Sequence, residues 1–89
     1  MSKFDFGTFY GEQDSIFAVS RGVSKEEADR IYAYETGDSP HDCDVIYGYV
    51  YFGFGVDDQG EKQHGWWLAY GKPQKRTHVP VYIYQRKES

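Results

Sequence analysis

The sequence predicts an α+β fold, in which a small antiparallel sheet of about five strands packs on one helix in the order β-β-α-β-β-β. One segment has a helix-type start signal and helical apolar spacing, whereas the segments around it alternate in the two-residue period of strands. Turn-forming residues separate these segments. Because 89 residues suffice for one modest hydrophobic core, a single domain spanning residues 1–89 is expected.

Two strands are expected near the N-terminus. Apolar side chains alternate with small or polar ones from Phe4 to Tyr10, and a second apolar run extends from Ile16 to Val19. The polar break from Gly11 to Ser15 lies between them. A turn at this break would make the two strands a hairpin.

The clearest local signal is the start of a helix. Ser24 and Glu27 have the spacing of a capping box, and acidic side chains are favourable in the first turn. A helix is therefore predicted from about Lys25 to Glu35, ending before Gly37. Its apolar face is made by Ala28, Ile31 and Tyr32, and on its surface Glu26 is spaced to pair with Arg30.

Three strands are predicted in the second half of the chain. They are Val45–Gly55, Lys62–Tyr70 and His78–Arg86. The residues Asp57 to Gly60 form a hairpin turn signal between the first two strands. A polar loop is predicted from Gly37 to Asp42, and Gly71 to Pro73 end the middle strand.

Alternation along the first and last of these strands separates two faces of the sheet. One face is aliphatic and phenyl: Ile46, Gly48, Val50, Phe52, Phe54, Val79, Val81 and Ile83. The other is rich in tyrosine: Tyr47, Tyr49, Tyr51, Tyr82 and Tyr84. We expect the helix to cover the aliphatic face and to leave the tyrosine face at least half exposed. Exposed tyrosines serve either as cross-strand packing or as a contact surface.

No motif identifies an enzyme, a cofactor or a metal site. The single cysteine, Cys43, excludes an internal disulfide and is expected to be a small buried residue. The segment His41 to Asp44 contains ligand-type side chains but lacks the spacing of a zinc site. Gly53 and Gly55 lack the rest of a phosphate-binding loop and are expected to mark a bulge or a bend. We therefore expect no catalytic residue, no metal and no cofactor.

Charge is divided along the chain. Residues 1–61 carry thirteen Asp and Glu against four Lys and Arg, and residues 62–89 carry one acid against six bases, within an overall net charge of −4. Ten of the acids fall between positions 26 and 61, where Arg30 is the only base. An acidic surface of this density bears on partners and association rates, because it resembles the phosphates of a duplex.

A compact, acidic, Tyr-rich domain without enzymatic motif or export signal resembles the small inhibitors that phages and mobile elements encode against CRISPR and restriction systems. The resemblance implies a non-enzymatic protein that binds a basic, nucleic-acid-handling complex in the cytoplasm of a bacterial host. It acts either by occluding nucleic acid or by blocking a conformational step. The candidate contact residues are acids with tyrosine anchors: Glu26, Glu27, Asp29, Asp38, Asp42, Asp44, Tyr47, Tyr49, Tyr51, Asp57 and Asp58.

Two alternatives remain open. The basic C-terminal region combines bases and aromatic rings as single-stranded nucleic-acid sites do: Trp66, Trp67, Lys72, Lys75 and Arg76. The net charge of −4 opposes such binding unless the two charge regions separate in space. A homodimer joined through strand edges or the tyrosine face is the other alternative. No stretch is apolar enough for a signal peptide or a membrane span, so no membrane contact is expected.

Overall fold

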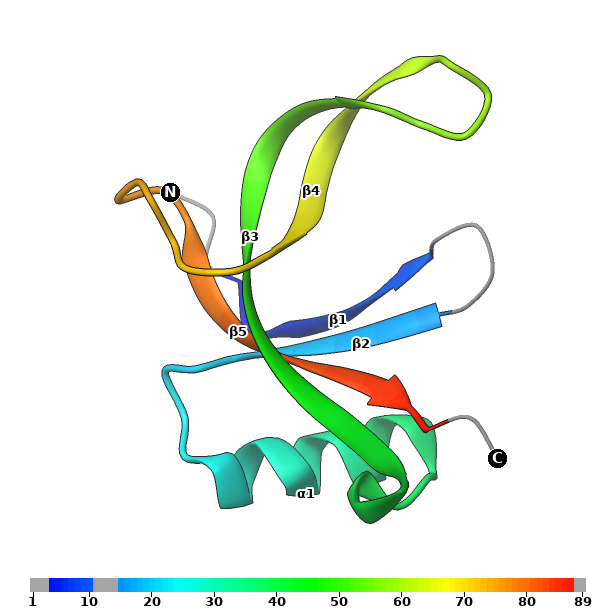
Figure 1. The fold of residues 1–89 in the computed structure, drawn as a ribbon, viewed down its shortest axis with the longest axis vertical. Helices are drawn as coiled ribbons and strands as arrows, with labels where there is room; N and C mark the ends of the chain where they lie inside the picture. Colours follow the sequence, from blue (N-terminus) through cyan, green and yellow to red (C-terminus); the bar gives the residue numbers. More distant parts are fainter. Residues whose placement is uncertain (1–3, 11–14, 88–89) are drawn as a thin grey trace.

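The computed structural model describes residues 4–10 and 15–87 and confirms the predicted α+β class (Figure 1). Its elements are β1 (Phe6–Tyr10), β2 (Ser15–Ser20), α1 (Lys25–Thr36), the short 3-10 helix η1 (Pro40–Asp42), β3 (Cys43–Val56), β4 (Lys62–Tyr70) and β5 (Val79–Arg86). The antiparallel sheet has the order β1-β2-β5-β3-β4. Most of the predicted break between β1 and β2, residues 11–14, lies outside the described residues. In the described part of the chain, no helix is long and apolar enough to cross a bilayer.

Helix α1 begins and ends where its capping residues indicated. The Ser24 hydroxyl accepts a hydrogen bond from the Glu27 backbone N–H at 3.2 Å, which confirms Ser24 as the helix cap, whereas the Glu27 carboxylate of the predicted capping box pairs with Arg30. Gly37 ends the helix in the left-handed conformation, with φ of 76°. The predicted pair of Glu26 with Arg30 is wrong, because the Arg30 guanidinium lies 3.1 Å from the Glu27 carboxylate instead. Spacings of three and four residues both bring side chains together on a helix, and here the shorter one is used.

The helix covers the tyrosine face, so the prediction that it would cover the aliphatic face is wrong. Tyr32 of α1 stacks on Tyr84 of β5 with ring centroids 4.7 Å apart and an interplanar angle of 11°. Phe17 and Val19 of β2 join the same buried cluster. The Tyr84 hydroxyl donates a hydrogen bond to the Asp29 carboxylate at 2.7 Å. Since this hydroxyl has a partner at the helix, the tyrosine ring can be buried without leaving a polar group unsatisfied.

The middle of the aliphatic face is covered by the sheet itself, whereas Ile46, Phe52 and Phe54 of the same face stay exposed. The strands bend so that the sheet curls into a nearly closed barrel-like shape, visible from the strong curvature of β3 in Figure 1. Val50, Val81 and Ile83 are fully buried on this inner side. Phe4 packs against Trp66 with ring centroids 5.4 Å apart. The single sheet therefore has a hydrophobic core on each of its two faces.

Gly55, near the end of β3, leaves room for an indole ring. Strands β3 and β4 pair without an extra residue from Gly48 to Val56, so the bend of β3 is present but no bulge interrupts the pairing. A Cβ on Gly55 would lie 2.5 Å from Trp67 Cε2. The Trp67 indole N–H donates a hydrogen bond to the Gly53 carbonyl at 3.0 Å. The missing side chain at Gly55 thus leaves the space in which the indole lies across the strand.

Candidate functional site

The structure does not bring the predicted acidic residues to one patch. Helix α1 lies at one end of the longest axis of the molecule and the β3–β4 turn at the other (Figure 1). The Cα trace extends 35 Å along that axis. The helix residues Glu26 and Glu27 are therefore far from Asp57 and Asp58 in the turn. A single partner surface cannot use all of the predicted acids unless it spans the whole length of the domain.

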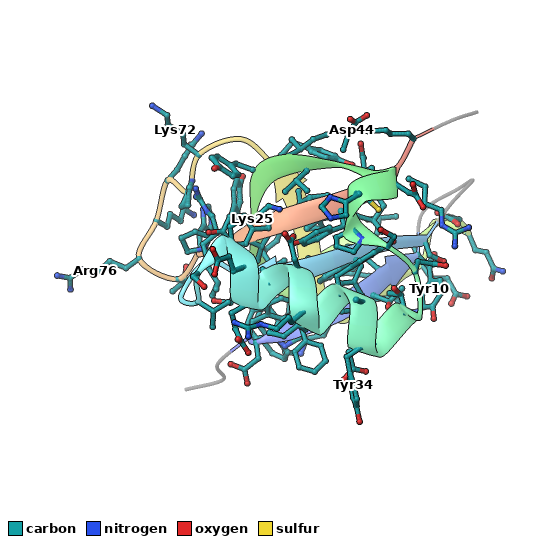
Figure 2. All side chains as sticks on the ribbon, turned by 90° about the horizontal axis from the view of Figure 1, so that it is seen from below. Tyr10, Lys25, Tyr34, Asp44, Lys72 and Arg76 are labelled. Carbon is teal, nitrogen blue, oxygen red and sulfur yellow. The ribbon has the colours of Figure 1, made fainter. Side chains whose placement is uncertain are left out.

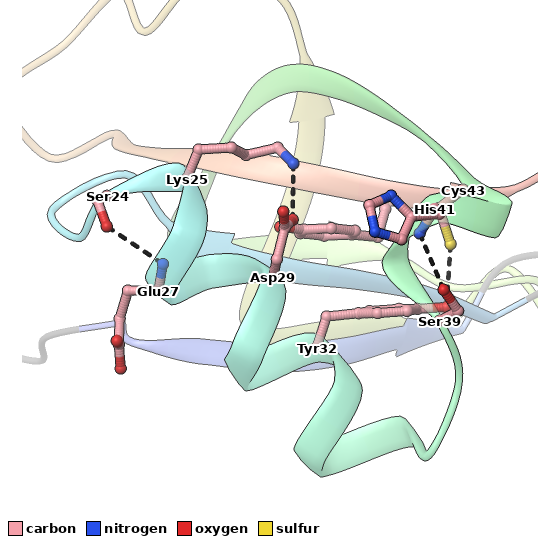
Figure 3. A network of polar contacts seen from close by, with 9 residues as sticks. Ser24, Lys25, Glu27, Asp29, Tyr32, Ser39, His41 and Cys43 are labelled. Atoms are coloured by element: carbon pink, nitrogen blue, oxygen red, sulfur yellow. Dashed lines mark hydrogen bonds and ion pairs between the residues drawn. The ribbon is translucent and has the colours of Figure 1, made fainter.

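Several of the helix-side acids are engaged within the protein. The ion pairs are Lys25–Asp29 at 2.6 Å, Arg30–Glu27 at 3.1 Å and Arg86–Asp38. Figure 3 shows the Asp29 carboxylate directed at the side-chain nitrogen of Lys25. Burial raises the pKa of Asp29, but hydrogen bonds from Lys25 and Tyr84 outweigh it and leave the pKa below its ordinary value. Asp29 thus joins the helix to the sheet, which limits what it can offer a partner.

Asp57 shapes the hairpin turn. One of its carboxylate oxygens accepts hydrogen bonds from the backbone N–H groups of Gln59 at 3.0 Å and Glu61 at 2.8 Å. The other accepts from the Gln63 side chain at 3.2 Å. The bond from Glu61 is the main cause that lowers the pKa of Asp57. Gly60 completes the turn with φ of 78°. The predicted turn is confirmed, and the Asp57 carboxylate is largely occupied by it.

We expect Asp57→Ala to lower the thermal unfolding midpoint at pH 7 and Asp58→Ala to leave it unchanged. Asp58 is exposed beside Asp57 and makes none of these turn contacts, so it is a matched control. Because the pKa of Asp57 is depressed, its contribution is present above the ordinary value of 3.8 and is lost as the pH falls below it. Thermal melts followed by circular dichroism at neutral and acidic pH measure both effects. Equal midpoints for the two variants at pH 7 would contradict this role.

The part of the tyrosine face not covered by the helix lies against basic and histidine side chains. Tyr49 stacks on His78 with ring centroids 4.3 Å apart and an interplanar angle of 10°. The ring centroid of Tyr51 lies 5.8 Å from the centroid of the same imidazole. Tyr47 is 59% exposed, and the Arg21 guanidinium lies 4.7 Å from its ring centroid. The predicted tyrosine anchors are thus brought together, but beside Arg21 and His78 and not beside acids.

His78 connects these rings to a loop with three cations. Its Nδ1 accepts a hydrogen bond from the Gln74 backbone N–H at 3.1 Å, and its own backbone N–H donates to the Lys75 carbonyl at 3.1 Å. These two hydrogen bonds hold the loop between β4 and β5 against His78. Lys72, Lys75 and Arg76 are exposed on this loop. Within the described ranges, none of the three has a carboxylate within ion-pair distance.

The two charge regions of the sequence are only partly separated in space, because Arg86 pairs with Asp38 whereas the loop cations lie away from Asp44. In Figure 2, Lys72 and Arg76 extend from one side of the molecule and Asp44 lies on the other. We use the term aromatic–basic face for the surface formed by Arg21, Tyr47, Tyr49, Tyr51, Lys72, Lys75, Arg76 and His78. This face combines the exposed ring of Tyr47 and the half-buried rings of Tyr49 and Tyr51 with three exposed cations of the loop.

The two tryptophans of the alternative hypothesis point to opposite sides of the sheet. Trp66 packs against Phe4 and Phe52 on the inner side. Trp67 is paired in register with Tyr51 and lies on the outer side with it.

Arg21 belongs to the site but was not predicted from the sequence. Its place beside Tyr47 results from the pairing of distant segments, for which no local signal exists.

Cys43 is buried, as predicted. Its side chain is 7% exposed, and its thiol donates a hydrogen bond to the Tyr32 hydroxyl at 3.0 Å (Figure 3). Burial, followed by this contact with Cys43, raises the pKa of Tyr32. Among residues 4–10 and 15–87, no group of three or more His, Cys, Asp or Glu side chains is placed to hold a metal ion. The thiol acts as a packing group between the helix and the sheet.

Comparison with known proteins gives no relative: no family model, no curated protein and no solved structure matches the chain. The arrangement of side chains on the protein surface is therefore the remaining indication of function.

Proposed function

We propose that this protein is a non-enzymatic binding domain that holds single-stranded nucleic acid on its aromatic–basic face. The observation that carries the proposal is the stack of Tyr49 on His78, which ties the tyrosines of β3 to a loop with three exposed cations, none of which has a carboxylate within ion-pair distance in the described residues. Single-stranded nucleic acid requires both groups, because its bases stack on aromatic rings while its phosphates pair with Lys and Arg. Neighbouring Tyr47, with its ring 59% exposed, offers further stacking area.

The net charge of −4 does not prevent this binding, because charge acts locally in salt solution. The Debye length is about 8 Å at physiological ionic strength. The Cα trace measures 35 × 29 × 21 Å, so acids at the far side, such as Asp44, are screened from a ligand on the loop. Four cations, Arg21 and the three of the loop, favour the ligand. If each of these cations pairs with one phosphate, the logarithm of the binding constant falls with the logarithm of the salt concentration with a slope of about −3.

Neutralising the loop cations is expected to weaken binding by about tenfold or more at low salt and to reduce the salt slope by about 2. The variant is Lys72→Gln, Lys75→Gln and Arg76→Gln combined. Fluorescence anisotropy of a labelled oligothymidylate of roughly 12 nucleotides, titrated at several salt concentrations, measures both quantities.

Tyr47→Ala, at an exposed ring, is expected to cost about 1–3 kcal/mol of binding free energy through lost base stacking in the same titration.

The control changes the same number of charges elsewhere. It combines Arg30→Gln, Lys62→Gln and Lys87→Gln, three exposed bases outside the aromatic–basic face. If the loop is the site, this control retains both the affinity and the salt slope. Equal losses in the two triple variants would mean that only overall charge matters, and no binding of the unmodified protein at low salt would refute the proposal.

The inhibitor of a nucleic-acid-handling complex, which the sequence resemblance implied, is the second candidate function. It is favoured by exposed acids at the end of α1 and the start of β3 that have no base within ion-pair distance in the described part of the chain: Glu35, Asp42 and Asp44. A pull-down from bacterial lysate with and without nuclease tests this candidate. A stoichiometric complex that survives nuclease and is lost with Asp42→Asn and Asp44→Asn would support it. Recovery that disappears with nuclease would favour the first proposal.

A further inference from the structure

An open groove lies between the two edge strands of the sheet. β1 and β4 are the end members of the order β1-β2-β5-β3-β4, and in residues 4–10 and 15–87 each of them pairs with one strand only. The curled sheet brings these edges toward each other, and a cavity of about 950 Å³ separates them. Its lining is largely apolar and includes Phe9 and Ile16 from one side and Leu68 from the other.

Consecutive residues of both strands line this groove. They are Gly7, Thr8 and Phe9 on β1, and Trp66, Trp67 and Leu68 on β4. Side chains alternate between the two faces of a sheet, so a groove on one face would be lined by every second residue. Contact with consecutive residues therefore places the groove between the strand edges, where backbone groups point.

The pairing registers show which backbone groups face the groove. The Ser20 N–H donates to the Asp5 carbonyl, and hydrogen-bonded pairs alternate along antiparallel strands, so the groups of Phe6, Thr8 and Tyr10 point away from β2. On the other side, the Asp57 N–H donates to the Glu61 carbonyl. By the same alternation, the backbone groups of the lining residues Trp66, Leu68 and Tyr70 of β4 point away from β3. Both walls of the groove thus present rows of backbone donors and acceptors that have no strand partner in the described ranges.

We propose that this groove accepts one extended peptide segment of a partner protein, which pairs with β1 and β4 and completes the barrel. Addition of a strand to an exposed edge is a common mode of peptide recognition, and here two edges would be satisfied by one segment. From the rise per residue, the strand spacing and the sheet thickness, a five-residue strand occupies roughly 800 Å³. The cavity of about 950 Å³ has room for it.

The lining specifies the chemistry of the peptide. Side chains on its inner side would meet Phe4, Phe9 and Leu68, so aliphatic residues are required at alternate positions. The charged residues in the described lining, Asp5 and Asp57, are both acids. A peptide with Lys or Arg near its ends complements them, whereas a polyanion does not. The groove shares no residue with the aromatic–basic face, so this inference is independent of the nucleic-acid proposal.

The test uses the capped peptide Lys-Val-Thr-Ile-Thr-Val-Lys and amide hydrogen exchange followed by NMR on the full chain. Peptide binding is expected to slow the exchange of the Thr8 and Leu68 amides by about tenfold or more. The Gly7 amide, already directed toward β2, is expected to change little. The same peptide with N-methylated backbone amides is the control, because it keeps the side chains but cannot form the strand pairing.

Asp5→Asn is expected to weaken peptide binding, and Asp58→Asn, which changes the same charge outside the groove, is expected to retain it. Absence of protection at saturating peptide, or equal binding of the N-methylated peptide, would overturn the proposal. Protection of the same amides by raising the protein concentration without peptide, together with a dimer on a sizing column, would also overturn it. The occupant would then be a second copy of this chain.

Discussion

Gly48→Ala is expected to destabilise the fold by about 3 kcal/mol, at the upper end of the usual cost of overpacking. Gly48 is buried in β3, where a Cβ would lie 2.4 Å from the Ala69 carbonyl oxygen and 2.4 Å from Ile83 Cδ1. The Ile83 side chain can adjust, but the Ala69 oxygen belongs to the backbone of the paired strand β4. Relief of this clash requires a shift of β4 relative to β3, which disturbs the inner core.

Gly53→Ala is the matched control, since it makes the same change in the same strand. A Cβ at Gly53 has no heavy atom within 4 Å, so we expect a change of less than about 0.5 kcal/mol in the free energy of unfolding. Urea unfolding of the two variants, followed by circular dichroism and compared at a common slope, measures the difference. Similar midpoints for both variants would mean that β3 and β4 are not as closely packed as the structure describes.

Elements set by neighbours in the chain could be predicted from the sequence. The helix start depends on Ser24 and Glu27, and the hairpin turn on Asp57 and Gly60. Each of these interactions spans four residues or fewer, so the residue types at those positions carry the information. The predicted strand Lys62–Tyr70 likewise has the bounds of β4.

The covered face of the sheet could not be predicted, because both faces of β3 and β5 are apolar enough to be buried. The hydrogen bond from Tyr84 to Asp29, which permits burial of the tyrosine side, joins residues 55 positions apart. The curling of the sheet, which buries Val50 and Val81, depends on the packing of all five strands. Neither property can be predicted from residues that are close in the sequence. The alternation of side chains shows that the sheet has two faces, but it does not show which face packs against the helix.

The candidate site was predicted in parts but not as a whole. The tyrosines of β3 were expected to act with the acids, yet the structure places Tyr47 beside Arg21 and Tyr49 on His78. The cations Lys72, Lys75 and Arg76 were predicted as part of the alternative site. The link between their loop and the tyrosines is the stack of Tyr49 on His78, a contact between distant segments. Composition therefore identified the chemistry of the surface, and only the fold could show which groups share it.

Tyr84→Phe is expected to lower the free energy of unfolding by about 2 kcal/mol at pH 7. Tyr84 is 2% exposed, and its hydroxyl donates to the ionised Asp29 carboxylate, a charge-assisted bond of the kind worth about 1.5–3 kcal/mol. The lower part of this range applies, because the Asp29 side chain is 29% exposed and keeps its pair with Lys25. Phenylalanine retains the stack on Tyr32, so the variant removes the hydrogen bond without leaving a large cavity.

The same variant is expected to reduce the loss of stability at alkaline pH. Burial, then the hydrogen bond with Asp29 and its negative charge, raise the pKa of Tyr84 well above the ordinary value of 10.0. Above pH 10 the unfolded chain releases this proton while the folded protein retains it, so the contribution is complete below pH 10 and falls as the pH rises, by up to about 1.4 kcal/mol per pH unit. Urea unfolding from about pH 8 to about pH 11 measures this slope.

Tyr47→Phe is the control for the alkaline slope, because it makes the same change at a ring that is 59% exposed. Tyr32, whose pKa is also raised by burial, remains in both variants and contributes equally to them. Tyr84→Phe is therefore expected to unfold with a shallower alkaline slope than either the unmodified protein or Tyr47→Phe. If all three proteins lose stability at the same rate above pH 10, the Tyr84 hydroxyl is not held by Asp29 in solution, and the tyrosine face is not fixed under the helix by that bond.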